Sequence, residues 1–542
     1  MRSDKLLYRV GIASTRSDGG SPVRRALLVI LLACSAAFLV AGCSGEDSET
    51  AQEGTEASTQ PDTTGEEAAT TEASGDQPNM IFVLTDDLDY ASIQKMPEIN
   101  SLLKDEGATF GNAFISHPIC CPSRSTILTG LYDHNHNVIS NRYPDGGFRK
   151  FREQGHEEES IAVSLQDGGY QTGFFGKYLN GYTAEDPTHV PPGWDEWYGK
   201  LYEQELYDYS LNENGEEVSY GSEPEDFFTD VLSGKATDFV RQAAPEDQPF
   251  FAYVAPTAPH GPATPAERHK GAFADEEAPR PPSFNEEDVS DKPSGIRTSD
   301  PLSEQDISEI DVLYKRRLES MLAVDEMVGS LVEELEAAGE LDNTYIFFTS
   351  DNGFEQGEHR IKGGKDRPYE ESARVPFFVR GPGIAPGSEV EELAVNTDFA
   401  PTFADLASVE FPADGRSLAP LLRGEEPAWR SSVLLEKLPA EENDEEANGK
   451  GKGKSKNKGK GKGKAKTGAD GSPAFETIRT ETYKYVEYEN GETELYDLQN
   501  DPYELESLHE SADPSLIEDL KARLEALEEC SGDGCREAED AQ

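Results

Sequence analysis

Residues 80–87 read MIFVLTDD, an apolar run of strand length that ends in a threonine and two aspartates. The run is rich in β-branched and aromatic side chains and does not alternate with polar ones, which predicts a strand covered on both faces. Two similar runs occur at 250–254 (FFAYV) and 345–348 (YIFF). Helical patterns lie between them, for example at 307–335, where apolar residues recur three and four apart. This alternation predicts an α/β fold with a mainly parallel sheet flanked by helices.

Polar residues follow each of the three runs. Asp86 and Asp87 follow the first, His260 follows the second, and Asp351 and Asn352 follow the third. Ligands gather at the carboxyl ends of strands in such sheets, so these side chains predict one shared polar site. A bound Ca²⁺ or Mg²⁺ would offset the repulsion between neighbouring carboxylates. Composition alone leaves an equal alternative, in which they are helix caps or turn residues.

The composition excludes several classes of protein. Among 542 residues, 106 are acidic and 49 basic, so the formal charge is −57 and no nucleic-acid partner is expected. Hydrophobic residues make up 35%, which is below the globular average and predicts that part of the chain is unfolded. Six cysteines are too few for a disulfide-built scaffold. No apolar stretch is long enough for a multi-pass membrane protein.

The first 43 residues have the features of an export signal. Arg24 and Arg25 precede an apolar run at 26–41, which is typical of a signal peptide rather than a membrane span. The run leads into Val-Ala-Gly-Cys, which resembles a bacterial lipobox with Cys43 as the lipidated residue. We therefore expect a lipoprotein anchored to the outer face of the cell membrane. The alternative is an ordinary cleaved signal and a secreted protein, and the export route stays open.

Two segments predict disorder. Residues 44–78 contain ten acidic and no basic residues, which predicts a solvated tether between residues 1–43 and a catalytic region at 79–438. Residues 439–472 form an insert in which an acidic run precedes nine lysines interleaved mostly with glycine. This insert is either a tolerated surface insertion without function, which is the simpler interpretation, or a basic arm that attracts a polyanionic substrate.

The last segment, 473–542, predicts a smaller antiparallel subdomain. The strand-like runs 478–488 and 493–498 flank Asn490-Gly491, a pair that favours a hairpin turn. A helix is predicted near 516–527.

Residues 120–130 read CCPSRSTILTG, and at this point the chain strongly resembles the sulfatase family. Paired cysteines can also be a buried thiol pair or a zinc site, but no further Cys or His lies at convincing ligand spacing. Other segments of the chain also match the family, in the order in which the family has them, at 79–90, 173–181, 258–260, 349–378, 414–422 and 495–508. The resemblance implies an alkaline-phosphatase-like α/β fold.

The resemblance also implies a role for each matched residue. One Ca²⁺ per chain is expected, with a Cα-formylglycine made from Cys120 by a formylglycine-generating enzyme. The implied metal set is Asp86, Asp87, Cys120, Asp351 and Asn352. The implied catalytic set is Cys120, Arg124, Lys177, His260 and Lys365. Arg124 would hold the modified residue, while the two lysines and the histidine would surround the sulfate, with His260 or a neighbouring lysine as general acid.

One position departs from the family pattern. Many sulfatases have a histidine two positions after the first lysine, where this chain has Leu179. Asn180, or a histidine of the DHNH stretch at 133–136, is a candidate to replace it. His359 lies near the second metal strand, and it either lines the pocket or is a structural histidine.

The expected activity is hydrolysis of sulfate monoesters by the hydrated aldehyde of formylglycine. The motif pair CCPSR and HNHNV resembles N-acetylglucosamine-6-sulfatases and heparan 6-O-endosulfatases, so a sulfated carbohydrate of the 6-O-sulfo-N-acetylglucosamine type is the expected substrate. The alternatives are a broad arylsulfatase, a phosphate or phosphonate monoester hydrolase, and a non-catalytic lipoprotein that binds glycans. The near-complete set of catalytic residues argues against the last.

The remaining cysteines receive structural assignments. Cys121 is expected to be buried. Cys530 and Cys535 lie five residues apart in a chain expected outside the cytoplasm, so they can form a small local disulfide.

Overall fold

The structure is a computed structural model that describes residues 77–182, 186–201, 205–440 and 473–542. The predicted signal peptide with its lipobox, the acidic tether up to residue 76 and residues 441–472 of the insert lie outside these ranges. Within them, no helix combines the length and apolar character that crossing a membrane requires. The described residues all belong to one compact unit by their internal contacts.

The larger sheet has ten strands and is mixed, with a parallel centre. Its spatial order is β11 (Ser388–Val390), β2 (Ala108–Phe110), β10 (Phe378–Arg380), β9 (Thr344–Ser350), β1 (Asn79–Thr85), β8 (Phe250–Ala255), β4 (Gln171–Gly176), β5 (Glu196–Leu201), β6 (Ser210–Glu213) and β7 (Glu216–Ser219). The three predicted strands are the neighbours β9, β1 and β8, all parallel. The carboxyl ends of these strands therefore meet at one edge, as the sequence predicted.

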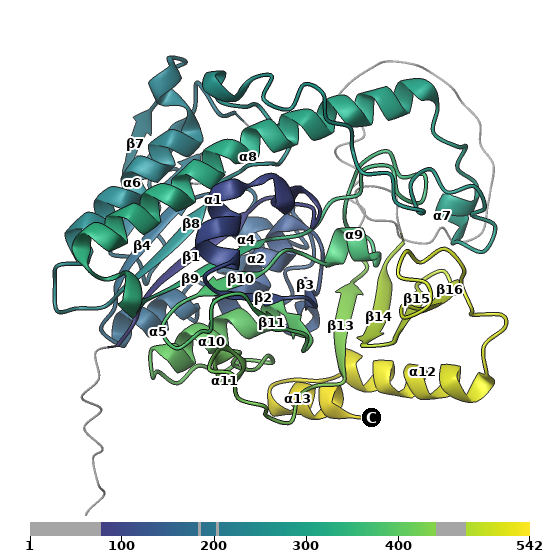
Figure 1. The fold of residues 1–542 in the computed structure, drawn as a ribbon. Coiled ribbons are helices and arrows are strands. Elements are labelled where there is room, and N and C mark those ends of the chain that lie inside the picture. Colours follow the sequence, from purple (N-terminus) through teal and green to yellow (C-terminus); the bar gives the residue numbers. More distant parts are fainter. Residues whose placement is uncertain (1–76, 183–185, 202–204, 441–472) are drawn as a thin grey trace, which may run out of the picture. The chain divides into compact units, whose positions relative to one another are not determined.

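Both faces of this sheet are covered by helices (Figure 1). Along β1, Phe82 belongs to the apolar cluster that includes residues of α5 (Ile161–Asp167) and α10 (Phe399–Leu406). Its neighbour Val83 belongs to a second cluster, formed with α6 (Phe228–Ala243) and α8 (Glu304–Ala338). Because successive side chains of a strand point to opposite faces, a non-alternating apolar run is what two covered faces require.

The other elements are shorter and mostly lie in the connections. The helices are α1 (Pro97–Ile99), α2 (Cys120–Thr129), α3 (Asp133–His136), α4 (Gly147–Glu153), α7 (Ser294–Arg297), α9 (Glu370–Ala373), α11 (Ala419–Leu422), α12 (Pro514–Glu528) and α13 (Asp533–Asp540). β3 (Ala113–Phe114) and β12 (Ala394–Val395) form a separate parallel pair. The helices predicted at 307–335 and 516–527 are α8 and α12.

A four-stranded antiparallel sheet lies near the C-terminus and differs from the prediction in two ways. Its order is β13 (Ser432–Lys437), β14 (Phe475–Thr480), β15 (Tyr483–Tyr488) and β16 (Thr493–Asp497). The run predicted as one strand at 478–488 is two strands, because Glu481 and Thr482 make a tight turn between β14 and β15. The sheet also begins before the insert, at β13, so the boundary placed at 438 divides it. The hairpin at Asn490-Gly491 is confirmed.

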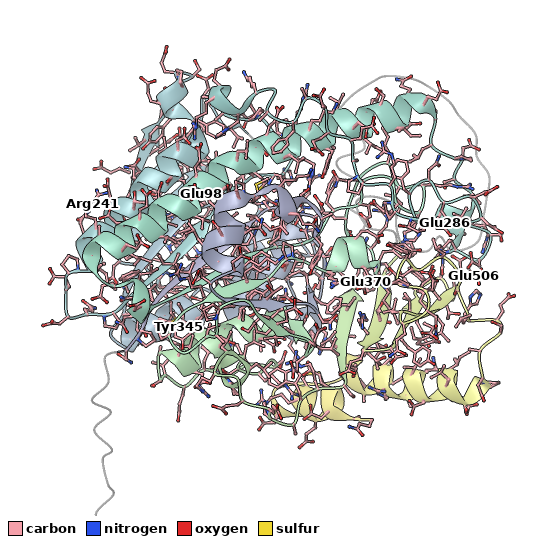
Figure 2. All side chains as sticks on the ribbon, in the orientation of Figure 1. Glu98, Arg241, Glu286, Tyr345, Glu370 and Glu506 are labelled. Carbon is pink, nitrogen blue, oxygen red and sulfur yellow. A yellow bond between two sulfur atoms is a disulfide. The ribbon has the colours of Figure 1, made fainter. Side chains whose placement is uncertain are left out.

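Buried polar contacts join this sheet and α13 to the segments around α9 and α2. Glu370 lies at the start of α9 (Figure 2). It pairs with Arg479 of β14 at 3.1 Å and with Lys484 of β15 at 3.5 Å. Glu539 of α13 pairs with Arg430 at 3.1 Å and accepts a hydrogen bond of 2.7 Å from Tyr132, which follows the helix that carries Cys120. All of these charged groups lie at least mostly out of solvent, so their pairing satisfies charges that could not otherwise be buried.

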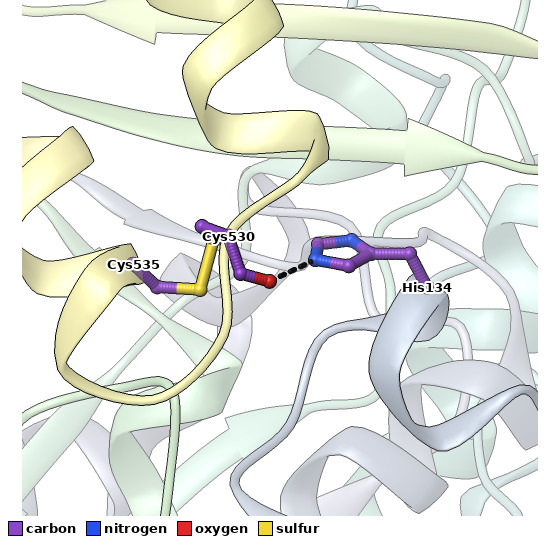
Figure 3. A group of neighbouring side chains, drawn as sticks. All are labelled: His134, Cys530 and Cys535. Carbon is purple, nitrogen blue, oxygen red and sulfur yellow. Dashed lines mark hydrogen bonds between the residues drawn. A yellow bond between two sulfur atoms is a disulfide. The ribbon is translucent and has the colours of Figure 1, made fainter.

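The predicted disulfide is present between Cys530 and Cys535 (Figure 3). The carbonyl of Cys530 accepts a hydrogen bond of 3.0 Å from His134 Nε2, while His134 Nδ1 lies 3.0 Å from the Glu436 carboxylate. The disulfide therefore fixes a turn between α12 and α13, and that turn holds His134 in a structural contact.

Candidate active site

Cys120 occupies the first turn of α2 and is 1% exposed. Proline is tolerated in this turn, where Pro122 lies, because the first amides of a helix have no intrahelical acceptor. Gly130 ends the helix with a φ of +68°, a conformation that glycine adopts without strain. The C-x-P-S-R…T-G pattern thus encodes a short helix whose positive N-terminal end carries Cys120.

Four oxygen-bearing side chains converge beside Cys120 from the ends of β1 and β9. Asp86 Oδ1 lies 3.4 Å from Cys120 Sγ. The backbone of Asp87 turns to a φ of +68°, and its N–H donates to Asp351 Oδ1 at 3.1 Å. Asn352 Nδ2 donates to Asp87 Oδ1 at 2.8 Å. All four side chains are almost fully buried. The parallel register of β1 with β9 brings them together, because it places the ends of the two strands side by side.

Two lysines place their ammonium groups against the carboxylates. Lys177 follows Gly176, where a Cβ would lie 2.1 Å from the Ala255 carbonyl, so only glycine permits β4 to approach β8 this closely. Lys177 Nζ donates to Asp86 Oδ2 at 2.7 Å. Lys365 Nζ contacts Asp87 Oδ1 and lies 2.7 Å from Cys120 Sγ.

Arg124 and His260 complete the set. Arg124 is buried on α2, donates from Nε to Asp351 Oδ2 at 2.9 Å and from Nη1 to the Lys177 carbonyl at 2.8 Å. It therefore ties the helix to the ends of β9 and β4. His260 Nδ1 lies 2.7 Å from the Gly261 carbonyl, and its Nε2 lies 3.8 Å from Asp87 Oδ2.

Burial and charge set the ionisation of the site. Burial alone would raise the pKa of Asp86, but the charges of Lys177, His260 and Arg124 outweigh it and hold that pKa well below its usual range. For Asp351, burial and the neighbouring Asp86 carboxylate raise the pKa. Burial also raises the pKa of the Cys120 thiol, and the two lysines do not offset it. An unmodified Cys120 is therefore a neutral thiol and a poor nucleophile at neutral pH.

The donor set fits a hard divalent cation. Side-chain atoms of Asp86, Asp87, Cys120 and His260 lie within 4.8 Å of one another. Asn352 Oδ1 is buried and has no hydrogen-bond donor among the described residues. Carboxylate and amide oxygens are the ligands that Ca²⁺ prefers, and an unused amide oxygen on a residue that contacts the Asp87 carboxylate is consistent with such a site.

Comparison with known proteins decides the family. The family model described as Sulfatase matches residues 78–409. The chain belongs to the sulfatase family. It is 34% identical to N-acetylglucosamine-6-sulfatase of Homo sapiens, over 85% of this chain and 86% of that protein. It is 39% identical to an extracellular sulfatase Sulf-1 homologue of Caenorhabditis elegans, over 67% of this chain, and spans about half (52%) of that relative's length.

A solved structure gives the same result for the fold. It is a complex with its substrate D-glucosamine-2-N,6-O-disulfate, and it superposes with a TM-score of 0.67 at 25% identity, covering 86% of this chain and 99% of the other. The predicted α/β fold with a mainly parallel sheet and a small antiparallel C-terminal sheet is therefore confirmed. Sulfatases are sulfuric ester hydrolases, and this chain is an enzyme of that class.

The structure of this sulfatase brings all the sequence-predicted site residues together, while the histidines considered as further candidates lie elsewhere. Leu179 is buried in the apolar core. His134 contacts Glu436 and Cys530, and His136 Nε2 lies 3.2 Å from Asp133 Oδ1, so neither contacts the residues around Cys120. His359 is fully buried, with Nδ1 2.8 Å from Glu286 Oε2, which is the structural alternative for this histidine.

Sequence reasoning missed Arg317 on α8. This buried guanidinium donates to the Asp87 carbonyl and to Asp89 Oδ2 (3.2 Å), and it reaches the Pro259 carbonyl at 3.4 Å. It therefore holds the end of β1 against the segment that carries His260. The available signal was an arginine one residue before Leu318, on the apolar side of a long amphipathic helix.

Proposed function

We propose that this sulfatase hydrolyses sulfate monoesters of carbohydrates, with 6-O-sulfated glucosamine as the preferred class. The single observation that supports the reaction is the meeting of four chain segments around Cys120: the start of α2 and the ends of β1, β4 and β9. The sugar class is supported by the coverage and identity shared with the human N-acetylglucosamine-6-sulfatase and by the substrate of the solved relative.

The residues of this chain supply positive charge and a proton. Lys177, Lys365 and the N-terminus of α2 direct positive charge at the space around residue 120, where they would stabilise the non-bridging oxygens of a sulfate. Arg124 holds α2 in register with Asp351, which keeps these groups in place. Nδ1 of His260 is directed at the Gly261 carbonyl, so Nε2, which lies 3.8 Å from Asp87 Oδ2, is the ring nitrogen that would protonate the leaving oxygen.

Two groups complete the proposed site. Asp86, Asp87, Asp351 and Asn352 would hold one Ca²⁺, which when bound adds positive charge beside the sulfate. Formylglycine formed from Cys120 by a formylglycine-generating enzyme would supply a hydrated aldehyde as nucleophile in place of the neutral thiol.

The proposed location is the outer face of the cell membrane, with lipid on Cys43. The apolar run and the Val-Ala-Gly-Cys sequence support it. Mass spectrometry of the mature N-terminus is the test, and an N-terminal residue other than a lipidated Cys43 would favour secretion.

A comparison of substrates tests the proposed activity. We expect kcat/KM to be highest for 6-O-sulfo-N-acetylglucosamine, lower for other sulfated sugars, and measurable for nitrophenyl sulfate. Cys120→Ala is the control for contaminating activity, and mass spectrometry of the peptide containing Cys120 should find formylglycine. A rate confined to the aryl ester would refute the carbohydrate assignment. A higher rate on phosphate or phosphonate monoesters than on any sulfate would favour the related hydrolase class.

A further inference from the structure

Lys365 is held by a segment with an unusual backbone. The next residue, Asp366, is 5% exposed and has a φ of +71°. Residues other than glycine rarely adopt this backbone conformation, and it persists where the surrounding structure fixes it. Here it lies directly beside a lysine whose Nζ is 2.7 Å from Cys120 Sγ.

Three contacts fix Asp366, two from the segment before α2 and one from the C-terminal sheet. Its N–H donates to the Pro118 carbonyl at 2.9 Å. His117 Nε2 donates to its Oδ1 at 3.0 Å. Lys437 Nζ, on the last residue of β13, pairs with its Oδ2 at 2.6 Å. Both oxygens of the carboxylate are therefore bound, one from the segment before α2 and one from the C-terminal sheet.

The partners of Asp366 are themselves buried and fixed. His117 is 1% exposed, and its Nδ1 contacts Asp133, the first residue of α3. Lys437 is 5% exposed. The residue before it, Glu436, donates its backbone N–H to the Ser116 carbonyl at 2.7 Å. The end of β13 is therefore joined to the strand-to-helix segment that leads to Cys120.

We propose that His117, Asp366 and Lys437 form a positioning network that sets the conformation of Lys365, so that the C-terminal sheet takes part in binding the anionic group of the substrate. These residues do not touch the reacting atoms. They act through Lys365, whose ammonium group lies where the proposed function places a sulfate oxygen, and in this respect the inference rests on that function.

A mutant cycle tests the network. Lys437→Met keeps the length of the side chain and removes its charge. We expect kcat/KM to fall 10–100-fold, which is the usual loss when a residue that orients a binding side chain is replaced. Lys365→Ala should cost roughly 10²–10³-fold. The kcat/KM of the double variant K365A/K437M should lie within about twofold of that of K365A. If Lys437 acts only through Lys365, its replacement has no further effect once Lys365 is absent. Asp366→Asn, which still tolerates a positive φ, should behave like Lys437→Met.

Lys292→Met is the matched control. Lys292 is also a fully buried cation, but it contacts Tyr496 and the Glu504 carbonyl. We expect any loss of kcat/KM in K292M to be the same with Lys365 present or replaced by alanine. If K437M behaves in this additive way, or keeps kcat/KM within twofold, Lys437 does not position Lys365 and the proposal is overturned.

Two readouts separate this proposal from the proposed function. Inorganic sulfate binding to the Cys120→Ala protein, by calorimetry, needs no turnover, and K437M should weaken it at least fivefold only when Lys365 is present. The crystal structure of K437M tests the placement whatever the substrate is. We expect Lys365 Nζ to leave hydrogen-bond distance of residue 120, and an unchanged Lys365 would overturn the proposal.

Discussion

Replacing His117 by glutamine should cost the protein more thermal stability at pH 6 than at pH 9.5. Burial by itself lowers the pKa of this imidazole, but the Asp133 and Asp366 carboxylates outweigh burial and raise it from 6.5 to about 9. A group with a raised pKa in the folded state stabilises fully below its unfolded value, here about 6.5. That stabilisation disappears as the pH rises through about 9.

The magnitude follows from the gap between these two values. At about 1.4 kcal/mol per pH unit, the difference between 6.5 and about 9 amounts to about 3 kcal/mol between pH 6 and pH 9.5. For roughly 430 described residues, the entropy of unfolding is about 0.9 kcal/mol/K. The gap in Tm between the parent and His117→Gln should therefore shrink by about 3 °C over this range.

Thermal melts of both proteins at one scan rate provide the assay. Only the difference between the two is informative, because the pKa values of His134 (about 9) and His359 (about 10) are also raised and act equally in both proteins. His156→Gln is the matched control. Because burial lowers the pKa of His156, the difference in Tm between the parent and His156→Gln should not shrink above pH 6. A His117→Gln gap of equal size at both pH values would refute the ion-paired imidazolium.

Three further predictions concern the site itself. Chelation should abolish activity and Ca²⁺ should restore it, and Asp351→Asn should raise the Ca²⁺ concentration for half-maximal activity at least tenfold, because one charged ligand is lost. Cys120→Ala should abolish turnover, measured with nitrophenyl sulfate, whereas Cys121→Ala should keep substantial activity because the Cys121 side chain is buried in the apolar core. Arg317→Lys should lower kcat/KM about tenfold, because an ammonium group cannot reproduce the fork that reaches the Asp87 and Pro259 carbonyls.

Each of these has an opposing result. A metal-free preparation with full activity would exclude the role of the cation. Loss of activity in Cys121→Ala alone would move the nucleophile by one residue. An Arg317→Lys protein with unchanged kcat/KM and lower Tm would make Arg317 a stabilising residue only.

The central strands and the residues at their ends could be predicted because their signals are local. A strand between two helical layers must be apolar on both faces, and β1, β8 and β9 are. The carboxyl ends of parallel neighbours meet, which brought Asp86 and Asp351 together without further information. The pattern around Cys120 encodes a helix start, and the resemblance to sulfatases supplied the remaining roles.

The features that the sequence did not predict leave no signal in the local pattern of residues. Glu481 and Thr482 offer no glycine or proline to mark the turn between β14 and β15. β13 lies before the insert and pairs with a strand after it, so no local pattern assigns it to the C-terminal sheet. Lys437 meets Asp366 only through that pairing, and a lone lysine at a strand end carries no signal of its partner.

The bond between Tyr132 and Glu539 has a consequence for biosynthesis. The two residues lie 407 positions apart, and at roughly 5–20 residues per second the ribosome adds the second about 20–80 s after the first. During this interval the segment after the Cys120 helix lacks a buried partner that it has in the finished protein. The nascent chain should therefore present this segment in a loosely packed state, open to modifying enzymes and to proteases, until α13 has emerged and docked.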